Sequence, residues 1–204
     1  KCFHDALAKE PKNIAAMNNL ANSYKAIGKL EFAEKLYKQL LVLNPNYLNA
    51  LNNFANLKFL INKYSEGIEF LKKAILIIEK NPEKNSKQLT QILFTLASAY
   101  QSIGDIEETK KVINKILLTD SNHTSSHKLM SEMTSYRLDD KVSMDHLNKM
   151  VSLNAGELTN EKKVDISFAL GKAYEDLEDY NKSFDYLRQG NQIKNNASSF
   201  DINS

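Results

Sequence analysis

Small and apolar residues recur in the same order at several places along the chain. The segments from Asn19 to Gly28 and from Thr95 to Gly104 share a Leu-Ala pair, a tyrosine, an isoleucine and a final glycine. A third copy begins at Ala169, and weaker copies lie around residues 54 and 130. Self-similarity at a fixed period predicts a stack of equivalent structural units, so the fold is that of a repeat protein.

One column of small residues gives the length of the unit. Its members are separated by 34, 42, 34 and 40 residues, and they are Ala21, Ala55, Ala97, Ser131 and Gly171. The unit is therefore 34 residues long, with about eight extra residues near 82–89 and about six near 158–163. A second small column follows 12 positions later, at Ala33, Gly67, Thr109, Ser143 and Ser183. A bulky column lies four positions beyond that, at Tyr37, Leu71, Ile113, Leu147 and Leu187. Small residues let two helices approach closely, so the columns predict antiparallel helix pairs.

The residues that break regular structure support helices. The chain contains only 6 glycines and 3 prolines, too few for an all-β protein with frequent turns. Gly28 and Gly104 stand where first helices should end, because glycine adopts the left-handed conformation at little cost. Phenylalanines recur at helical spacing, and we expect them in the core rather than in a ligand pocket: Phe32, Phe54, Phe70, Phe94 and Phe184.

The 34-residue pattern resembles the tetratricopeptide repeat family over nearly the whole chain. The resemblance implies an all-α fold, a right-handed superhelical solenoid of antiparallel helix pairs with about five and a half repeats. The expected boundaries are a half repeat at 1–13, full repeats at 14–47, 48–81, 90–123, 124–157 and 164–197, and a tail at 198–204. We expect residues 1–197 to form a single solenoid domain. Lys58 and Thr134 depart from the tyrosine column, and Leu138 and Glu178 stand where glycine is usual.

The charge pattern narrows the function classes. The chain has 27 basic and 25 acidic residues, mixed along its length, and a net charge of +2. A nucleic-acid binder would concentrate its basic residues on one stripe, so we expect no nucleic-acid partner. No apolar stretch approaches the roughly 20 residues of a membrane span, and we expect no membrane partner. A single cysteine, Cys2, excludes an internal disulfide framework and favours a cytoplasmic location.

Candidate catalytic groups are sparse. His123 and His127 have the four-residue spacing of paired zinc ligands, but no acidic residue or cysteine completes the set, so we expect no metal site. We interpret His146 as a surface group. The acidic residues around 139–140 and 176–179 fall at turns, where carboxylates stabilise the start of the next helix. We expect neither enzymatic activity nor a cofactor.

The family resemblance also implies a binding surface. First helices of successive repeats line a concave groove that takes extended or helical segments of protein or peptide partners. Seven asparagines fall on this face, which we call the asparagine face: Asn18, Asn19, Asn22, Asn49, Asn52, Asn53 and Asn56. An asparagine amide both donates and accepts, so it can pair with a peptide backbone of any sequence. The pattern is similar to the asparagine ladder of O-linked N-acetylglucosamine transferase. Alternatively, a chain rich in asparagine simply places it on any solvated face.

Other functions remain open at this level. A chaperone-type carboxylate clamp is not expected, because Asn18, Gln91 and Thr95 occupy the positions that need basic residues. The last repeat, from Phe168 to Asn191, resembles those that precede a sulfotransferase domain in bacterial proteins, which implies an accessory role for a catalytic domain outside this chain. Besides peptide binding and this accessory role, a further possibility is self-association into a homo-oligomer through the apolar ends of the solenoid.

Overall fold

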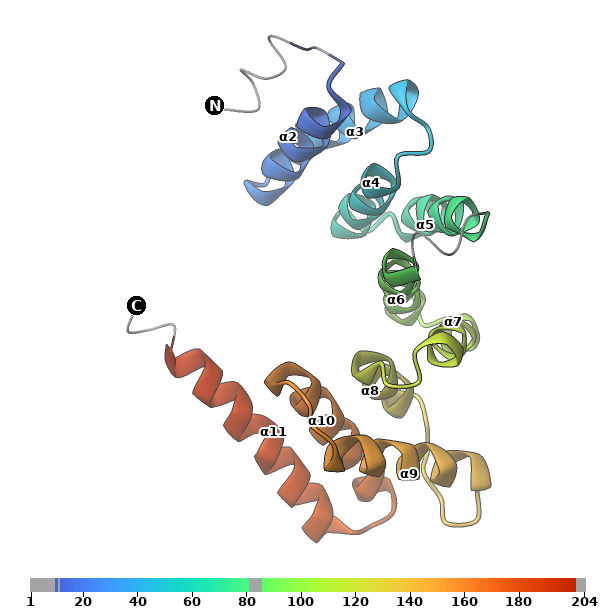
Figure 1. Cartoon of the computed structure of the whole chain (residues 1–204), viewed down its shortest axis with the longest axis vertical. Helices are drawn as coiled ribbons and strands as arrows, with labels where there is room; N and C mark the ends of the chain where they lie inside the picture. Colours follow the sequence, from blue (N-terminus) through green and yellow to red (C-terminus); the bar gives the residue numbers. More distant parts are fainter. Residues whose placement is uncertain (1–9, 11, 81–85, 201–204) are drawn as a thin grey trace. The chain divides into compact units, whose positions relative to one another are not determined.

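The computed structural model describes residues 10, 12–80 and 86–200, with side chains described up to residue 196. These residues form ten α-helices and no strand (Figure 1). In chain order the helices are α2 (Ile14–Ala26), α3 (Leu30–Leu43), α4 (Leu48–Leu60), α5 (Tyr64–Glu79), α6 (Ser86–Ser102), α7 (Ile106–Thr119), α8 (Thr124–Glu132), α9 (Lys141–Ala155), α10 (Asn160–Asp176) and α11 (Tyr180–Phe200). The expected all-α fold of paired helices is confirmed.

The chain divides into two compact units at residues 109 and 110, within α7. Unit 1 holds α2 to α6 and the start of α7, and unit 2 holds the rest of α7 and α8 to α11. The helices follow one another in the order of the five predicted repeats, and the two helices of a repeat pack on each other in the pairs α2 and α3, α4 and α5, and α10 and α11. The half repeat at 1–13 lies almost wholly outside the described residues, and the single solenoid domain over 1–197 stays a prediction.

The two insertions lengthen first helices. Helix α10 begins at Asn160, four residues before the predicted start of its repeat, and α6 begins at Ser86, four residues before its own. Each insertion therefore adds about one helical turn. Within unit 1, α5 still packs on α6, and within unit 2, α8 still packs on α10. The part of the first insertion before residue 86 lies outside the described residues.

The small columns lie at helix crossings, as predicted. Ala21, Ala55 and Ala97 have no exposed surface. At Gly171 in α10, an added Cβ would lie 2.6 Å from Cδ2 of Leu187 in α11, which is the bulky-column residue of the same repeat. The small residue thus makes the space that its bulky partner fills, because a side chain there would overlap it.

Four first helices end in the same way. The backbone N–H five residues beyond the tyrosine column donates to the carbonyl oxygen of that column, for example from Lys29 to Tyr24 (2.9 Å) and from Asp179 to Tyr174 (3.0 Å). The residue before the donor is left-handed in each case: Gly28 (φ 75°), Asn62 (φ 58°), Gly104 (φ 79°) and Glu178 (φ 59°). The backbone geometry is therefore kept where glycine is replaced.

The repeat at 124–157 departs from this pattern. Its first helix, α8, has 9 residues, and residues 133–140 connect it to α9 without helical structure. Thr134 stands in the tyrosine column beyond the end of α8, and the connecting segment instead buries Tyr136, which is 1% exposed. The aromatic ring lost from the column is replaced by one that enters the core from a loop.

The described aromatic side chains divide between core and surface. Phe54 is buried in the core of unit 1, where its ring centroid lies 5.5 Å from that of Tyr37 and 4.6 Å from that of Phe70. The expectation that all five phenylalanines belong to the core is wrong for Phe32 and Phe184, which are 58% and 64% exposed. Both lie on second helices, and Phe32 covers the ring of Tyr24 from outside, with centroids 5.4 Å apart.

Candidate functional site

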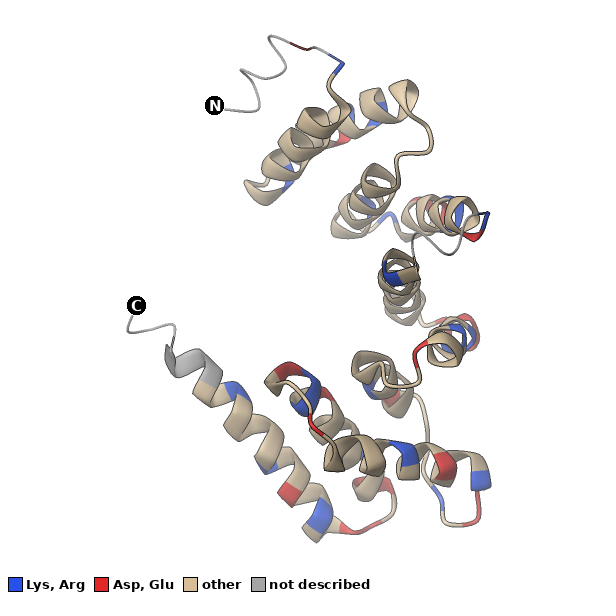
Figure 2. Cartoon of the chain, viewed as in Figure 1, with Lys and Arg blue, Asp and Glu red and all other residues tan. Residues whose placement is uncertain are grey.

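The asparagine face belongs to α2 and α4 of unit 1, two first helices that contact each other. These helices carry one charged residue each, Lys25 and Lys58, and no carboxylate. Figure 2 shows that basic and acidic residues are instead spread along several other helices, for example α9 and α11. The face is therefore built almost entirely from neutral amides and apolar side chains.

One asparagine pair joins successive repeats. Asn53 donates from Nδ2 to Oδ1 of Asn18, 3.1 Å away and 35 positions back along the chain. Asn18 is only 6% exposed, so its side chain is buried, whereas we expected it to face the groove. The bond also fixes which end of the Asn53 amide faces outward, because its nitrogen is turned toward Asn18.

Two further asparagines of the face are held by neighbouring helices. Asn22 accepts a 2.6 Å hydrogen bond at Oδ1 from the hydroxyl of Tyr37 in α3. Burial of that tyrosine raises its pKa far above the ordinary value, so it stays a donor. Asn49 accepts at Oδ1 from Nε2 of Gln88, at 3.1 Å. Gln88 lies in the extra turn of α6, so this insertion adds a contact to the face.

The remaining three asparagines have unused hydrogen-bonding capacity. Asn19 is exposed and Asn56 is half-buried, and neither side chain forms a hydrogen bond within the described residues. Oδ1 of Asn52 is shielded from solvent and has no hydrogen-bond partner in the part of the chain that the structure describes. The face thus combines amides fixed by internal bonds with amides that remain available to a ligand.

Lys58 lies beside this face, in the tyrosine column of its repeat. Its ammonium is 2.6 Å from Glu66 and 3.0 Å from Glu34, and 5.0 Å from the centroid of the Phe54 ring. Burial alone would lower the pKa of Lys58, but hydrogen bonds from the ammonium to Glu66 and Glu34 outweigh it and hold the pKa above its ordinary value. The lysine is charged and its charge is neutralised within the fold.

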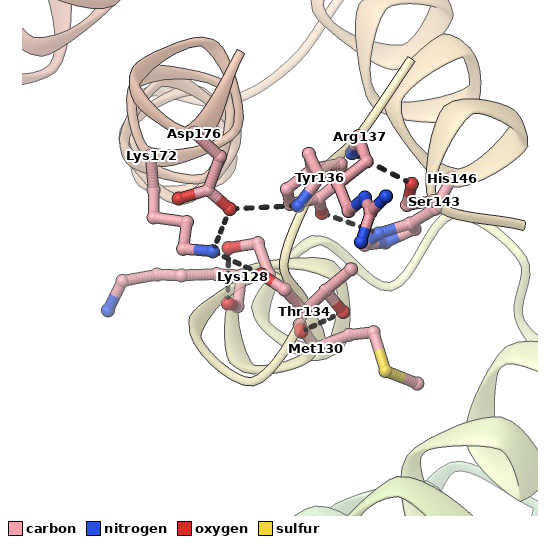
Figure 3. A network of polar contacts seen from close by, with 10 residues as sticks. Lys128, Met130, Thr134, Tyr136, Arg137, Ser143, His146, Lys172 and Asp176 are labelled. Carbon is pink, nitrogen blue, oxygen red and sulfur yellow. Dashed lines mark hydrogen bonds and ion pairs between the residues drawn. The ribbon is translucent and has the colours of Figure 1, made fainter. Parts of the chain in front are cut away.

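The first-helix side of unit 2 is charged instead. Lys172 of α10 donates to Asp176 and to the carbonyl oxygen of Thr134, and its ammonium lies 5.2 Å from the ring centroid of Tyr136 (Figure 3). Asp176 also accepts from the backbone N–H of Tyr136, at 2.9 Å. These contacts hold residues 133–140 against α10. The two units therefore offer first-helix faces of different chemistry.

Two of the acidic residues at turns, Asp140 and Asp179, cap the next helix as expected, whereas Asp176 binds Lys172 and the N–H of Tyr136. Asp140 accepts from the N–H of Val142 at the start of α9 (3.0 Å), and Asp179 accepts from the N–H of Lys182 near the start of α11 (3.2 Å). Contacts with Lys182 lower the pKa of Asp179. Among the described residues, no three His, Cys, Asp or Glu side chains are placed to hold a metal ion.

The histidines of unit 2 form hydrogen bonds, and His146 differs from its interpretation as a surface group. His123 caps α8, since its Nδ1 accepts from the N–H of Ser126 at 3.2 Å. His146 is not a surface group: it is half-buried, and it lies within hydrogen-bond distance of both His127 and Tyr136. Sequence reasoning missed this cluster because its members come from α8, α9 and the irregular segment between them.

Comparisons with known proteins identify the class. Residues 16–51, 90–123 and 164–196 match models of the tetratricopeptide repeat (TPR), and together these segments span half of the chain. The chain belongs to the tetratricopeptide repeat family. It is a helical-repeat scaffold of the kind typical of protein–protein interaction. No curated protein matches its sequence.

Solved structures share the fold at low sequence identity. YrrB, a TPR protein with an unusual peptide-binding site, is 15% identical, with a TM-score of 0.64 over 95% of this chain and 92% of that one. BtubC from P. vanneervenii is 15% identical, with a TM-score of 0.72 over 96% of this chain and 87% of that one. A putative kinesin light chain from Podosopora anserina is 15% identical, with a TM-score of 0.69 over 92% and 98%. No helix of the described residues has the length and apolar character of a membrane span.

Proposed function

We propose that the asparagine face of α2 and α4 binds an extended segment of a partner protein through the main chain of that segment. The observation that carries the proposal is the set of unpaired amides on a face without carboxylates, above all those of Asn19 and Asn56. A peptide backbone presents alternating N–H and C=O groups, and each asparagine amide can serve either.

The internal bonds of the face favour this function. Asn53 is oriented by Asn18 and Asn22 by Tyr37, so these amides need not be ordered when a ligand binds. Preorganised donors and acceptors lose less conformational entropy on binding, which raises the net contribution of each bond. That YrrB is a TPR protein with an unusual peptide-binding site agrees with a peptide ligand.

The expected affinity is modest. A neutral hydrogen bond contributes about 0.5–1.5 kcal/mol, so several must act together. Binding should depend little on salt, because the face carries few charges. A strongly salt-dependent complex would point to the charged helices of Figure 2 instead.

The test is an array of unbiased peptides probed with the unsubstituted protein and with Asn19→Ala/Asn56→Ala. Neither amide forms an internal hydrogen bond within the described residues, so the double variant should fold normally. Loss of two ligand bonds should weaken the binding of captured peptides roughly 5- to 150-fold. The matched control is Asn114→Ala/Asn181→Ala, two exposed asparagines on the second helices α7 and α11. Equal capture by all three proteins would reject the asparagine face and leave the scaffold without an assigned surface.

The sulfotransferase resemblance of the last repeat, the self-association module and the cytoplasmic location remain hypotheses drawn from the sequence. No contact among the described residues supports any of these three hypotheses.

A further inference from the structure

Two histidines and a tyrosine of unit 2 form a continuous line of hydrogen bonds, which we call the His–Tyr chain. His127 Nε2 lies 2.9 Å from the carbonyl oxygen of Ser121, and His127 Nδ1 lies 3.0 Å from Nε2 of His146. His146 Nδ1 lies 2.7 Å from the hydroxyl of Tyr136. The imidazole rings stack with centroids 5.1 Å apart. The His–Tyr chain therefore connects four parts of unit 2, which are the loop before α8, helix α8, helix α9 and the segment 133–140.

The positions of the protons follow from one fixed acceptor. A carbonyl oxygen can only accept, so Nε2 of His127 must carry a hydrogen and its Nδ1 must accept in the neutral ring. His146 must then donate from Nε2 and accept at Nδ1, and Tyr136 must donate its hydroxyl hydrogen. With both rings neutral, each gap holds one hydrogen and every bond is satisfied.

Added protons break this arrangement. A first proton places a hydrogen on His146 Nδ1, so the hydroxyl oxygen of Tyr136 now accepts from that nitrogen and the buried hydroxyl hydrogen loses its acceptor. A second proton places two N–H groups opposite each other across the 3.0 Å gap between the rings, together with two positive charges. Buried groups that lose a partner cost on the order of 1–3 kcal/mol each. Every donor and acceptor of the His–Tyr chain is therefore satisfied only while both rings are neutral, and the bond between the two rings is lost once both are protonated.

The surroundings of the rings favour neutrality. Burial lowers the pKa of His127 and outweighs the hydrogen bond to the Ser121 carbonyl, which raises it; the nearby Lys149 and His123 lower it further, and Asp120 opposes them weakly. Burial and the charge of His127 lower the pKa of His146 to about 4. On the other side of Tyr136 lie Asp176 and Lys172 of α10. No carboxylate of α8, α9 or α10 contacts either ring directly within the described residues.

Tyr136 links the rings to α10 (Figure 3). Its hydroxyl meets His146, its backbone N–H donates to Asp176, and Lys172 lies over its ring. The side chain is 1% exposed and is the principal apolar anchor of residues 133–140 in the core of unit 2. Protonation of His146 leaves the buried hydroxyl hydrogen of Tyr136 without its acceptor and places positive charge beside the tyrosine.

We propose that the His–Tyr chain is a proton-sensitive latch that holds residues 133–140 against α10 at neutral pH and releases them on acidification. Release would free Lys172 and Asp176 on the first-helix side of unit 2, so the latch controls which charges that face presents. The inference concerns unit 2 alone and does not depend on peptide binding by the asparagine face.

The first test uses the unsubstituted protein. Burial also lowers the pKa of His123, which lies outside the His–Tyr chain, so His123→Asn is used to assign its signal. Among the other histidines, nuclear magnetic resonance titration should show two that titrate well below about pH 6.5, the ordinary value. Assignment by His127→Gln and His146→Gln should identify these two as the members of the chain. Ordinary titration of both residues would overturn the proposal, because a closed chain cannot accept protons so easily.

The second test follows the segment itself. The chain contains no tryptophan, so Leu138→Trp, at a position that is 80% exposed, places a single emitter in residues 133–140. Its fluorescence should change between about pH 6.5 and 4, before the helical circular dichroism is lost. Adding His127→Gln/His146→Gln should abolish that change, whereas adding His123→Asn, which keeps a capping side chain, should not. A change that persists in the first background, or that coincides with loss of helicity, would show global acid unfolding rather than a latch.

Discussion

The ammonium group of Lys58 lies 2.6 Å from a carboxylate oxygen of Glu66, although the lysine side chain is only 3% exposed. A second carboxylate, that of Glu34 on α3, lies 3.0 Å away. One lysine of α4 therefore connects the second helix of the preceding repeat with the second helix of its own. It occupies a position that three other repeats give to tyrosine.

This geometry predicts different effects for two substitutions of Lys58. Lys58→Met keeps the volume and leaves Glu34 and Glu66 beside Lys38 (2.7 Å) and Lys63 (3.7 Å), so it should cost less than about 1.5 kcal/mol. Lys58→Ala also leaves a cavity against Phe54 and should cost about 2–4 kcal/mol. Urea unfolding of both variants measures the difference. Equal stability of the two would mean that the aliphatic stem contributes nothing to packing.

Overpacking of a helix crossing tests the repeat register. Ala97 has no exposed surface, so Ala97→Leu should destabilise the protein by about 1–3 kcal/mol. The control is Ala26→Leu at the exposed end of α2, which should change stability by less than about 0.5 kcal/mol. Thermal unfolding of both is sufficient, and an unchanged melting temperature for Ala97→Leu would contradict the register.

The left-handed residue Glu178 predicts a stabilising substitution. A side chain in this conformation costs about 1–2 kcal/mol, which glycine avoids at the price of a more flexible unfolded chain. Glu178→Gly should therefore stabilise by about 0.5–1 kcal/mol in urea unfolding. Leu138 is the equivalent position of the irregular repeat, and it is not left-handed. Leu138→Gly should destabilise by a similar amount, and a gain there would refute the conformational explanation.

The lowered pKa values of His127 and His146 fix the sign of a pH dependence. Below about pH 6.5 the unfolded chain takes up protons that the folded chain refuses, so folding stability should fall as pH drops from 6.5 to about 4. For His146 alone the loss should approach about 3 kcal/mol. Urea midpoints measured across this range, with His146→Gln as the comparison, check the slope. A variant with the same slope as the parent would remove His146 as its cause.

The fold was predictable from the sequence because each packing position recurs in several repeats. The column of Ala21, Ala55 and Ala97 placed helix crossings that the structure confirms, and the family models match the three repeats with the strongest sequence copies. The left-handed residue at Glu178 shows that backbone geometry survives where the residue does not.

The pairings between side chains were not predictable in the same way. Asn18 and Asn53 lie on the first helices of successive repeats, 35 positions apart and thus one residue more than the repeat length. This spacing does not indicate whether the two side chains bond to each other or to a ligand. Thr134 indicated that the fourth tyrosine was missing, but not that Tyr136 would replace it from a loop. Such contacts depend on rotamers and on segments outside the repeat pattern, where no second copy exists for comparison.

The extra turn at the start of α10 has a consequence for how this chain tolerates insertions and deletions. Four residues rotate the backbone by about 400°, so the connection from α9 enters α10 from nearly the same side as it would without them. An insertion of two residues would turn the entry point by about 200° and force the connection around the helix. Length changes at the start of first helices should therefore be accepted in whole turns, which makes these points natural places to lengthen or shorten the protein without altering the packing that follows.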